Sequence, residues 1–376
     1  MTLLGFLFVL LAYGMVVVWV PDLVGPAPSR AFYVVFAGCL WIYSTMDNID
    51  GKQARRTGNA SPLGELFDHG CDALNCPLAC LVQIAAMGLG PSGRALLVLF
   101  ISTWGFYLPT WEEYHTGVLY LGVVNGPTEG LLAAMGMMLV SAALGPQVWL
   151  QPVAWVGRVV PRARGAVLAD VVIGGFLVLF AAYYVPSCLL SVRRACARTG
   201  SSFWAALGQL APMLYVTVAV GLWLGSPLSH AQRDHFLLFF TAAGVAFGKM
   251  ATKIIYAYVA KCPFPRMTGL MLPLLCGALV LTALSGVLDA APAWLGAAET
   301  AYLWAYLGVC VVGYSNWIYH TISSICGHCD IYCLQIKQKR AVAPEPGARA
   351  SSAAPGKAAA PDAETDAQTQ PARPGQ

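Results

Sequence analysis

The stretch MDNIDGKQARRTGNASPLGELFDHGCDALN, residues 46–75, interrupts a chain that is otherwise largely apolar. It lies between two hydrophobic runs and holds five acidic residues and one histidine: Asp47, Asp50, Glu65, Asp68, Asp72 and His69. Ionisable groups at the edge of a bilayer are costly to keep and commonly functional. The stretch therefore indicates where the fold places its chemistry.

The composition around this stretch excludes an ordinary soluble protein. Of 376 residues, 58% are hydrophobic and only 11% are charged, which is under half the charged fraction usual for soluble domains. Residues 3–20, 95–111 and 267–288 carry no charge at all. Each run is long enough to cross a hydrocarbon layer of about 30 Å as a helix, and a helix satisfies its own backbone groups in lipid. The sequence predicts an all-α, polytopic integral membrane protein.

We expect about ten transmembrane helices, with the acidic stretch at the cytosolic ends of the early ones. They are predicted near residues 2–20, 31–55, 64–88, 92–112, 127–145, 166–190, 203–225, 235–259, 266–288 and 301–325. The first is interpreted as a span rather than a signal peptide, because no basic segment precedes it and Pro21–Asp22 is a poor cleavage site.

The chain divides by composition into two parts. Residues 1–340 are expected to form one transmembrane domain that contains the motif at 47–72. Residues 341–376 hold no large apolar side chain after Val342. Such a segment cannot bury enough apolar surface to fold, so we expect a disordered cytosolic tail.

Basic residues in the short loops predict the orientation. They follow the second, sixth, eighth and tenth expected spans: Lys52, Arg55, Arg56, Arg193, Arg194, Arg198, Lys261, Arg266, Lys337, Lys339 and Arg340. All these loops fall on one side, which the positive-inside rule makes cytosolic. Arg158, Arg162 and Arg164 fall on the other side and oppose this orientation.

The acidic stretch has the pattern of two facing helices. If residues 45–55 end a helix, then Asp47, Asp50, Gly51 and Ala54 share one face. The small residues leave a hollow for a flat or bulky ligand, and Arg55 lies at its edge.

A second helix is expected to begin near Leu63 after a polar turn. Its acidic face follows the spacing i, i+3, i+4 and i+7: Glu65, Asp68, His69 and Asp72. Two antiparallel helices would then present carboxylates at one membrane depth. Hard oxygen ligands suit Mg²⁺ or Mn²⁺, and a site for two such ions suits phosphoryl chemistry.

The acidic residues allow two alternatives to a catalytic metal site. Headgroup-level charges or helix caps could account for Asp47 or Glu65 singly, but not for five acids on two matched faces. A cation transporter would also place carboxylates in the membrane. It would not need the hollow at Gly51 and Ala54, or an arginine beside it.

Written as a pattern, the stretch is D-x2-D-G-x2-A-R-x8-G-x3-D-x3-D, from Asp47 to Asp72. This resembles the signature of the CDP-alcohol phosphotransferases. DGKQARRT and SPLGELFDHGCD are similar to the choline/ethanolamine phosphotransferase branch, and TWEEYHTGVLYL (110–121) and NGPTEG (125–130) are similar to the aminoalcohol phosphotransferases of plants and fungi. The likeness runs from residue 2 to about residue 338.

The resemblance implies a reaction. CDP-choline or CDP-ethanolamine would react with diacylglycerol to give phosphatidylcholine or phosphatidylethanolamine and CMP, the final step of the Kennedy pathway. It implies an active site that faces the cytosol in endoplasmic reticulum or Golgi membranes, and a homodimer, with no nucleic acid as partner. The alternatives are another CDP-alcohol phosphotransferase such as a phosphatidylinositol synthase, a membrane cation transporter and a catalytically inactive scaffold.

The resemblance also implies roles for single residues. Asp47, Asp50, Asp68 and Asp72 would hold two Mg²⁺ or Mn²⁺ ions. Gly51, Ala54, Arg55 and Gly64 would hold the CDP part. For the base that takes the proton of the diacylglycerol hydroxyl, Asp72 is the older assignment in the family. An imidazole titrates nearer the working pH than a metal-bound carboxylate, which favours His69 with Glu65 to orient it. Glu129 would either face the amino-alcohol head or act only as an acid at a helix N-terminus.

Two features fall outside this pattern. Members of the branch carry some tens of residues before the residue that matches Thr2, including an amphipathic segment, so we expect either a fragment or a shortened cytosolic lid. Cys326, Cys329 and Cys333 follow the last span at a spacing that fits no standard zinc site. They are interpreted as juxtamembrane cysteines that can carry lipid.

Overall fold

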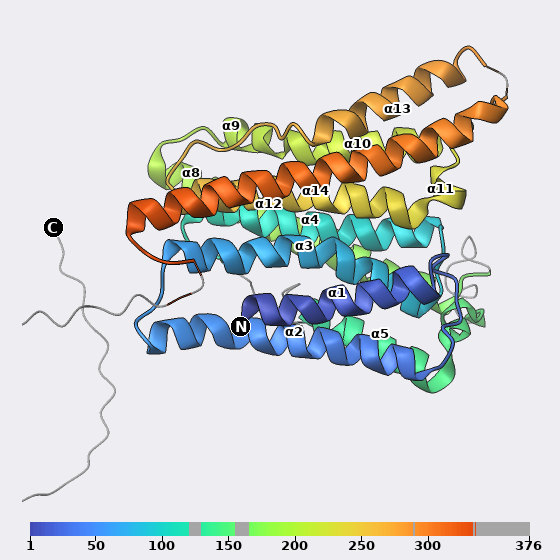
Figure 1. The fold of residues 1–376 in the computed structure, drawn as a ribbon, viewed down its shortest axis with the longest axis horizontal. Coiled ribbons are helices and arrows are strands. Elements are labelled where there is room, and N and C mark those ends of the chain that lie inside the picture. Colours follow the sequence, from blue (N-terminus) through green and yellow to red (C-terminus); the bar gives the residue numbers. More distant parts are fainter. Residues whose placement is uncertain (120–128, 155–164, 289, 334, 336–376) are drawn as a thin grey trace, which may run out of the picture. The chain divides into compact units, whose positions relative to one another are not determined.

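The computed structural model describes residues 1–119, 129–154, 165–288, 290–333 and 335. Within these ranges the secondary structure is helical, apart from one isolated antiparallel bridge between Pro152 and Val167. The predicted all-α class is confirmed (Figure 1).

The helices follow one another as long rods joined by short connections. Their bounds are α1 Thr2–Trp19, α2 Ala31–Arg56, α3 Pro62–Met87, α4 Gly93–Thr116, α5 Leu131–Leu144, η2 Pro146–Leu150, α7 Leu168–Leu179, η4 Phe180–Tyr184, α8 Val185–Thr199, α9 Phe203–Leu207, η5 Gly208–Leu210, α10 Ala211–Gly225, α11 Ala231–Asp234, α12 Phe236–Val259, α13 Met271–Ser285 and α14 Ala293–Cys329. The segments α7, η4 and α8 form one continuous rod, as do α9, η5 and α10.

The rods match the predicted membrane spans in order and place. Six of them are long and apolar enough to cross a bilayer: α1, α3, α7–α8, α9–α10, α12 and α14. α5 and α13 are shorter apolar helices, and α2 and α4 have 26 and 24 residues and end in polar side chains. The chain is an all-helical integral membrane protein. The last rod begins well before the predicted residue 301, because the helix at Ala293–Cys329 continues beyond its most apolar part.

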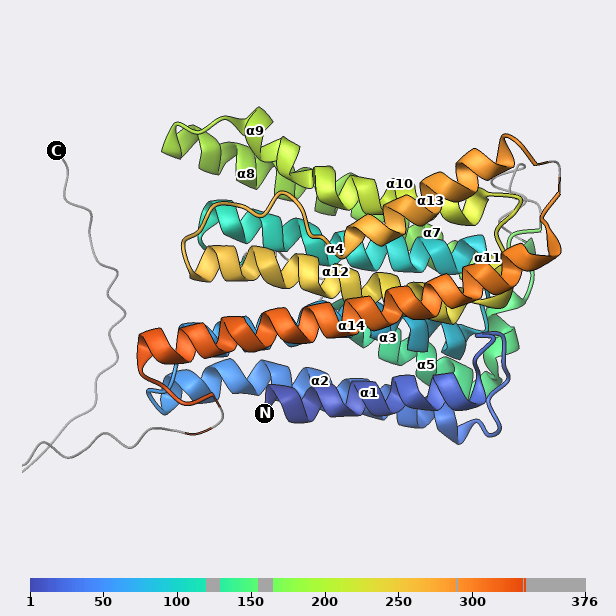
Figure 2. The ribbon, with the colours of Figure 1, turned by 45° about the horizontal axis from the view of Figure 1, so that its top comes forward.

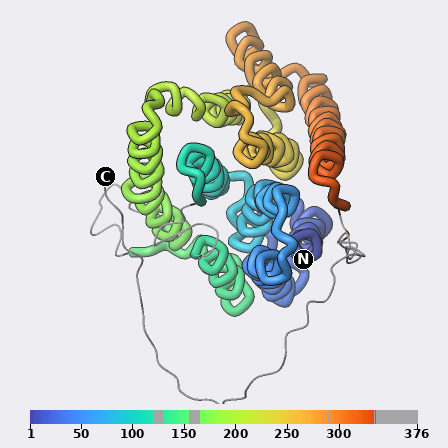
Figure 3. Tube along the Cα trace, turned by 90° about the vertical axis from the view of Figure 1, so that its left-hand side faces the viewer, coloured from blue at the N-terminus to red at the C-terminus, as the bar shows by residue number. Residues whose placement is uncertain are grey.

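The pair α3 and α12 forms the centre of the bundle. Most of both helices is buried, whereas most of α1 and α14 is not. α3 and α12 pack closely because α12 presents glycines to α3. A Cβ added at Gly248 would lie 2.6 Å from Leu74 Cδ2, and one at Gly244 would lie 2.9 Å from Pro77 Cβ. Small residues of this kind let membrane helices approach, and Figure 3 shows the resulting bundle along its rods.

The turn between α2 and α3 sets the position of the acidic stretch. α2 ends at Arg56, Gly58 takes a left-handed φ of 68°, and α3 begins at Pro62. The hydroxyl of Ser61 caps α3 by accepting a hydrogen bond of 3.1 Å from the amide of Gly64. The two helices therefore run antiparallel from this turn, as the sequence predicted, and the cap of α3 is Ser61 rather than an acidic residue.

Basic residues gather at the same end of the bundle as this turn. The α2–α3 turn, the α8–α9 connection and the end of α12 lie at the same end of the rods in two views (Figures 1 and 2). Arg55 and Arg56 close α2, and Arg198 lies in the last turn of α8. The arginines at 158, 162 and 164, the basic residues at 337–340 and the tail at 341–376 lie outside the described residues.

Candidate active site

Three aspartates from two helices converge near the α2–α3 turn. Asp47 of α2 and Asp68 and Asp72 of α3 each offer a carboxylate oxygen, and these oxygens lie within 4.8 Å of one another. Across the described part of the chain, no other group of three or more His, Cys, Asp or Glu side chains gathers its ligand atoms in this way. The three side chains are partly buried. Carboxylates at this separation repel one another unless a cation or protons offset their charge.

Neighbouring hydroxyls donate to Asp72 and Asp50, whereas one oxygen of Asp68 is without a partner among the described residues. The hydroxyl of Tyr43 donates to Asp72, and the hydroxyl of Thr2 donates to Asp50. Asp68 Oδ1 is buried and has no hydrogen-bond partner among the described residues. Asp50 lies one turn beyond Asp47 and outside the group of three. The structure thus gathers three of the four predicted metal ligands, with Asp50 beside them.

His69 faces a carboxylate from a third helix. Its Nδ1 lies 4.0 Å from Oε2 of Glu113, which is on α4 and only 5% exposed. Glu65, the partner expected from the sequence, is exposed on the first turn of α3. No role was predicted for Glu113 from the sequence. The signal that could have indicated one is an acid pair, Glu112 and Glu113, that is buried at the end of an apolar helix.

The predicted nucleotide residues lie on either side of the α2–α3 turn. The guanidinium of Arg55 lies over Gly51, where an added Cβ would be 3.4 Å from Nη1. The hollow expected at Gly51 therefore holds the Arg55 side chain. Gly64 is exposed in the cap turn of α3, and Ala54 is half-buried. Arg55 is itself exposed, so its guanidinium is free to turn toward an anion.

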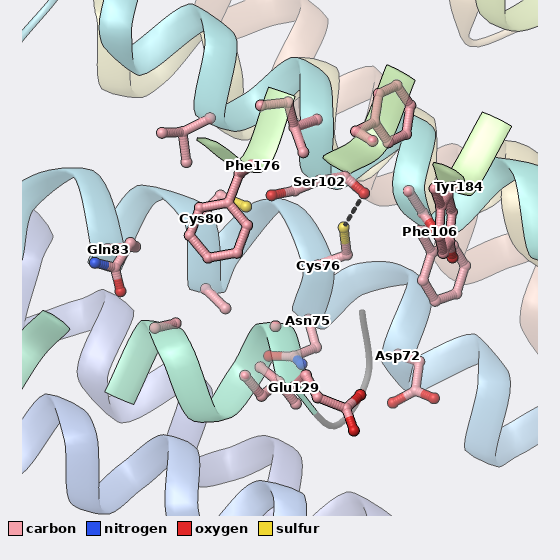
Figure 4. A pocket seen from close by; sticks show the side chains of 18 of the residues that line it. Asp72, Asn75, Cys76, Cys80, Gln83, Ser102, Phe106, Glu129, Phe176 and Tyr184 are labelled. Atoms are coloured by element: carbon pink, nitrogen blue, oxygen red, sulfur yellow. Dashed lines mark hydrogen bonds between the residues drawn. The ribbon is translucent and has the colours of Figure 1, made fainter. Parts of the chain in front are cut away.

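A cavity of about 340 Å³ leads inward from the acidic residues. Its polar end is lined by Asp47, His69, Asp72, Glu113 and Glu129. The rest is walled mainly by apolar side chains of α3, α4, α5 and the α7–η4 rod. From Asp72 to Met87, both of which line it, α3 rises by about 22 Å at 1.5 Å per residue. Figure 4 shows Asp72 and Glu129 toward one side and Gln83 toward the other.

A proline in α4 shapes one wall of the cavity. Pro109 has no amide hydrogen, so the carbonyl of Gly105 loses its helical partner. The hydroxyl of Tyr184 donates to that carbonyl at 2.8 Å. Tyr184 ends η4, a π-helical segment whose Phe180 and Tyr183 also line the cavity. The freed carbonyl thereby attaches the wall formed by η4 to α4.

Part of the predicted site falls outside the described residues. The segment NGPTEG is described only from Glu129, and TWEEYHTGVLYL only to residue 119. Glu129 itself lines the polar end of the cavity.

Comparison with known proteins indicates the family of the chain. The sequence model of the CDP-alcohol phosphatidyltransferase family matches residues 1–160. An uncharacterized class-I family protein of Schizosaccharomyces pombe is 33% identical over 82% of this chain and 78% of its own length. Choline/ethanolaminephosphotransferase 1 of Arabidopsis thaliana is 33% identical over 90% and 87%. Cholinephosphotransferase 1 of Saccharomyces cerevisiae is 28% identical over 91% and 87%.

The chain belongs to the CDP-alcohol phosphatidyltransferase family. It is an integral membrane transferase of phospholipid biosynthesis that acts on a CDP-alcohol and a lipid. The family resemblance drawn from the motif at 47–72 is confirmed.

Proposed function

We propose that the chain transfers phosphocholine or phosphoethanolamine from CDP-choline or CDP-ethanolamine to diacylglycerol and releases CMP. One observation carries this proposal: a single cavity joins a group of aspartates to a long apolar chamber. A water-soluble diphosphate and a lipid hydroxyl would meet where the two join. The names of the Arabidopsis and yeast relatives support the choice of donor.

The donor atoms fit a divalent metal ion. Asp47, Asp68 and Asp72 offer hard oxygen ligands within 4.8 Å of one another, and Asp68 Oδ1 has no partner among the described residues. We assign these three and Asp50 to two Mg²⁺ or Mn²⁺ ions. When bound, the ions would offset the negative charge that develops as CMP leaves.

The residues on either side of the α2–α3 turn suit the nucleotide. Gly51 and Ala54 let a ligand approach the backbone of α2, and Gly64 stands on the opposite side of the turn. Arg55 would leave Gly51 and pair with phosphate oxygens, for which a guanidinium has matching geometry.

His69 is assigned as the general base. The acceptor hydroxyl would give its proton to the imidazole, its oxygen would bond to the phosphorus that carries the amino alcohol, and the bond from that phosphorus to CMP would break. We assign Nε2 as the atom that takes the proton, because Nδ1 lies 4.0 Å from Oε2 of Glu113. Glu113 and Glu65 are candidates to orient the ring, and Asp72 is the alternative base.

Carboxyl groups line the polar end of the cavity, which suits a cationic amino-alcohol head. Glu113 and Glu129 line it together, and we assign Glu129 to face the head group. The basic residues at the ends of α2 and α8 favour a cytosolic site, in endoplasmic reticulum or Golgi membranes.

A transfer assay tests the proposal. The full chain in detergent, with diacylglycerol and Mg²⁺, would be given CDP-choline and CDP-ethanolamine in parallel, with CMP and lipid product both measured. We expect product from at least one donor. Product only from CDP-diacylglycerol and inositol would replace the proposal with phosphatidylinositol synthesis. Cation flux into liposomes without any transfer would replace it with transport.

A further inference from the structure

The inner end of the cavity holds a polar side chain that the proposed reaction does not use. Gln83 of α3 lines the cavity and is 4% exposed. Neither its Oε1 nor its Nε2 has a hydrogen-bond partner among the described residues. The lining at this end is otherwise apolar, with Met87 one helical turn beyond. Buried amides are nearly always paired, so this one points to a ligand group that completes it.

The depth of Gln83 indicates which part of a lipid would reach it. It follows Asp72 by eleven residues on the same helix, a rise of about 16 Å at 1.5 Å per residue. One leaflet of a bilayer core of about 30 Å is about 15 Å thick. A diacylglycerol whose hydroxyl lies beside His69 and Asp72 would therefore pass Gln83 with the distal half of an acyl chain.

An ordinary acyl chain matches this position poorly. Methylene groups would displace water from the cavity and leave the amide without a partner, which weakens binding by roughly tenfold. A hydroxyl on the chain offers both a donor and an acceptor. The Gln83 amide offers an acceptor oxygen and a donor nitrogen, so one hydroxyl restores the lost hydrogen bonding.

We propose that the inner end of the cavity is a subsite for an acyl chain with a hydroxyl in its distal half, and that Gln83 selects it. The inference rests on the proposed function, because it places the acceptor glycerol at the aspartates. It adds the chemical class of the acceptor chain, which neither the family nor the acidic motif specifies.

A competition assay measures this selection directly. Dioleoylglycerol and 1-oleoyl-2-ricinoleoylglycerol differ by one hydroxyl, since a ricinoleoyl chain is an oleoyl chain with a hydroxyl in its distal half. Both would be offered in one detergent micelle with Mg²⁺ and CDP-choline and, separately, CDP-ethanolamine, and the product ratio would be measured by mass spectrometry. We expect the wild type to favour the hydroxylated acceptor by about tenfold.

Variants separate the amide from the shape of the cavity. Gln83→Leu should bring the product ratio to one or below, and Gln83→Met should do the same if the leucine variant does not fold. Met87→Leu, at the same end of the cavity, should keep the wild-type ratio. A wild type without preference, or a Gln83 variant that keeps it, would overturn the inference.

Failure of the proposed function would give a different result. If the wild type makes product from neither acceptor with either donor, the proposed reaction is wrong. The subsite is then tested by lipid binding instead. The thermal unfolding midpoint would then be compared with each glyceride in the micelle. The ricinoleoyl lipid should stabilise the wild type more than dioleoylglycerol does, whereas the two lipids should stabilise Gln83→Leu equally. Equal stabilisation of the wild type by both lipids would refute the subsite.

Discussion

The first and second halves of α3 carry side chains of different chemistry. The first half carries Glu65, Asp68, His69 and Asp72 on one face. The second half is buried almost all round from Leu78 to Met87, as is typical of a helix at the centre of a bundle. One helix therefore supplies both the charged end and the apolar wall of the same cavity. In the proposed reaction, the charged end would take the diphosphate of the nucleotide and the apolar end would take the acyl chains of the lipid.

Removing divalent metal should abolish the function of the charged half completely. Chelation with EDTA should stop transfer, and Mg²⁺ or Mn²⁺ should restore it, because uncompensated carboxylates repel the diphosphate. The measurement is CMP release before chelation, after it and after metal is added back. Transfer that survives thorough chelation would rule out the two-metal assignment.

Asp68→Asn should have the second largest effect, a loss of roughly 100-fold or more in kcat. The substitution removes a carboxylate from the group of three and keeps the shape of the side chain. Asn48→Ala, an exposed change on α2, is the control and should transfer normally. Asp50→Asn in the same assay shows what an aspartate outside the group of three contributes to transfer. Residual activity of Asp68→Asn above a few per cent, with the fold intact, would count against its role.

His69→Ala should lower kcat by about 100-fold and change CDP-choline binding much less. A loss confined to binding would return the role of base to Asp72. The two candidate orienting acids can be compared in the same assay. Glu113→Gln should reduce kcat by roughly tenfold, and more than Glu65→Gln does, because Glu113 lies 4.0 Å from the imidazole and is buried. The opposite order would make Glu65 the orienting residue.

The smallest effect is expected at the cavity wall. Tyr184→Phe removes the hydroxyl that pairs with the carbonyl of Gly105, and should cost about 1 kcal/mol of stability. The KM for diacylglycerol should rise a few-fold while that for the CDP donor stays constant. Tyr183→Phe is the matched control, because its hydroxyl is not the one that attaches η4 to Gly105 of α4. Equal effects of both variants would show that the attachment does not shape the cavity.

Local sequence was sufficient to predict the helical rods and the acidic faces of α2 and α3. Each apolar run between polar turns predicted one helical segment, and the start expected near Leu63 lies one residue from the observed start of α3 at Pro62. The spacing of Asp68 and Asp72 placed both on one face, where the structure has them beside Asp47. Such patterns are readable because helical periodicity relates residues that are near in the chain.

Contacts between helices could not be predicted in the same way. The approach of Glu113 to His69 joins α4 to α3, and the bond from Tyr184 to Gly105 joins η4 to α4. Both depend on how far each rod is rotated about its axis, which the periodicity of a single helix does not specify. The buried amide of Gln83 appears in the sequence only as one polar residue in an apolar run.

The membrane class, the order of the rods, the family and the acidic motif follow from the amino-acid sequence, because each depends on composition or on spacing along one helix. Helix packing adds three features: the aspartates open into a long apolar cavity, Glu113 faces His69, and Gln83 lies at the inner end without a partner among the described residues. A cavity is the space that several helices leave between them, and it exists only once their packing is set.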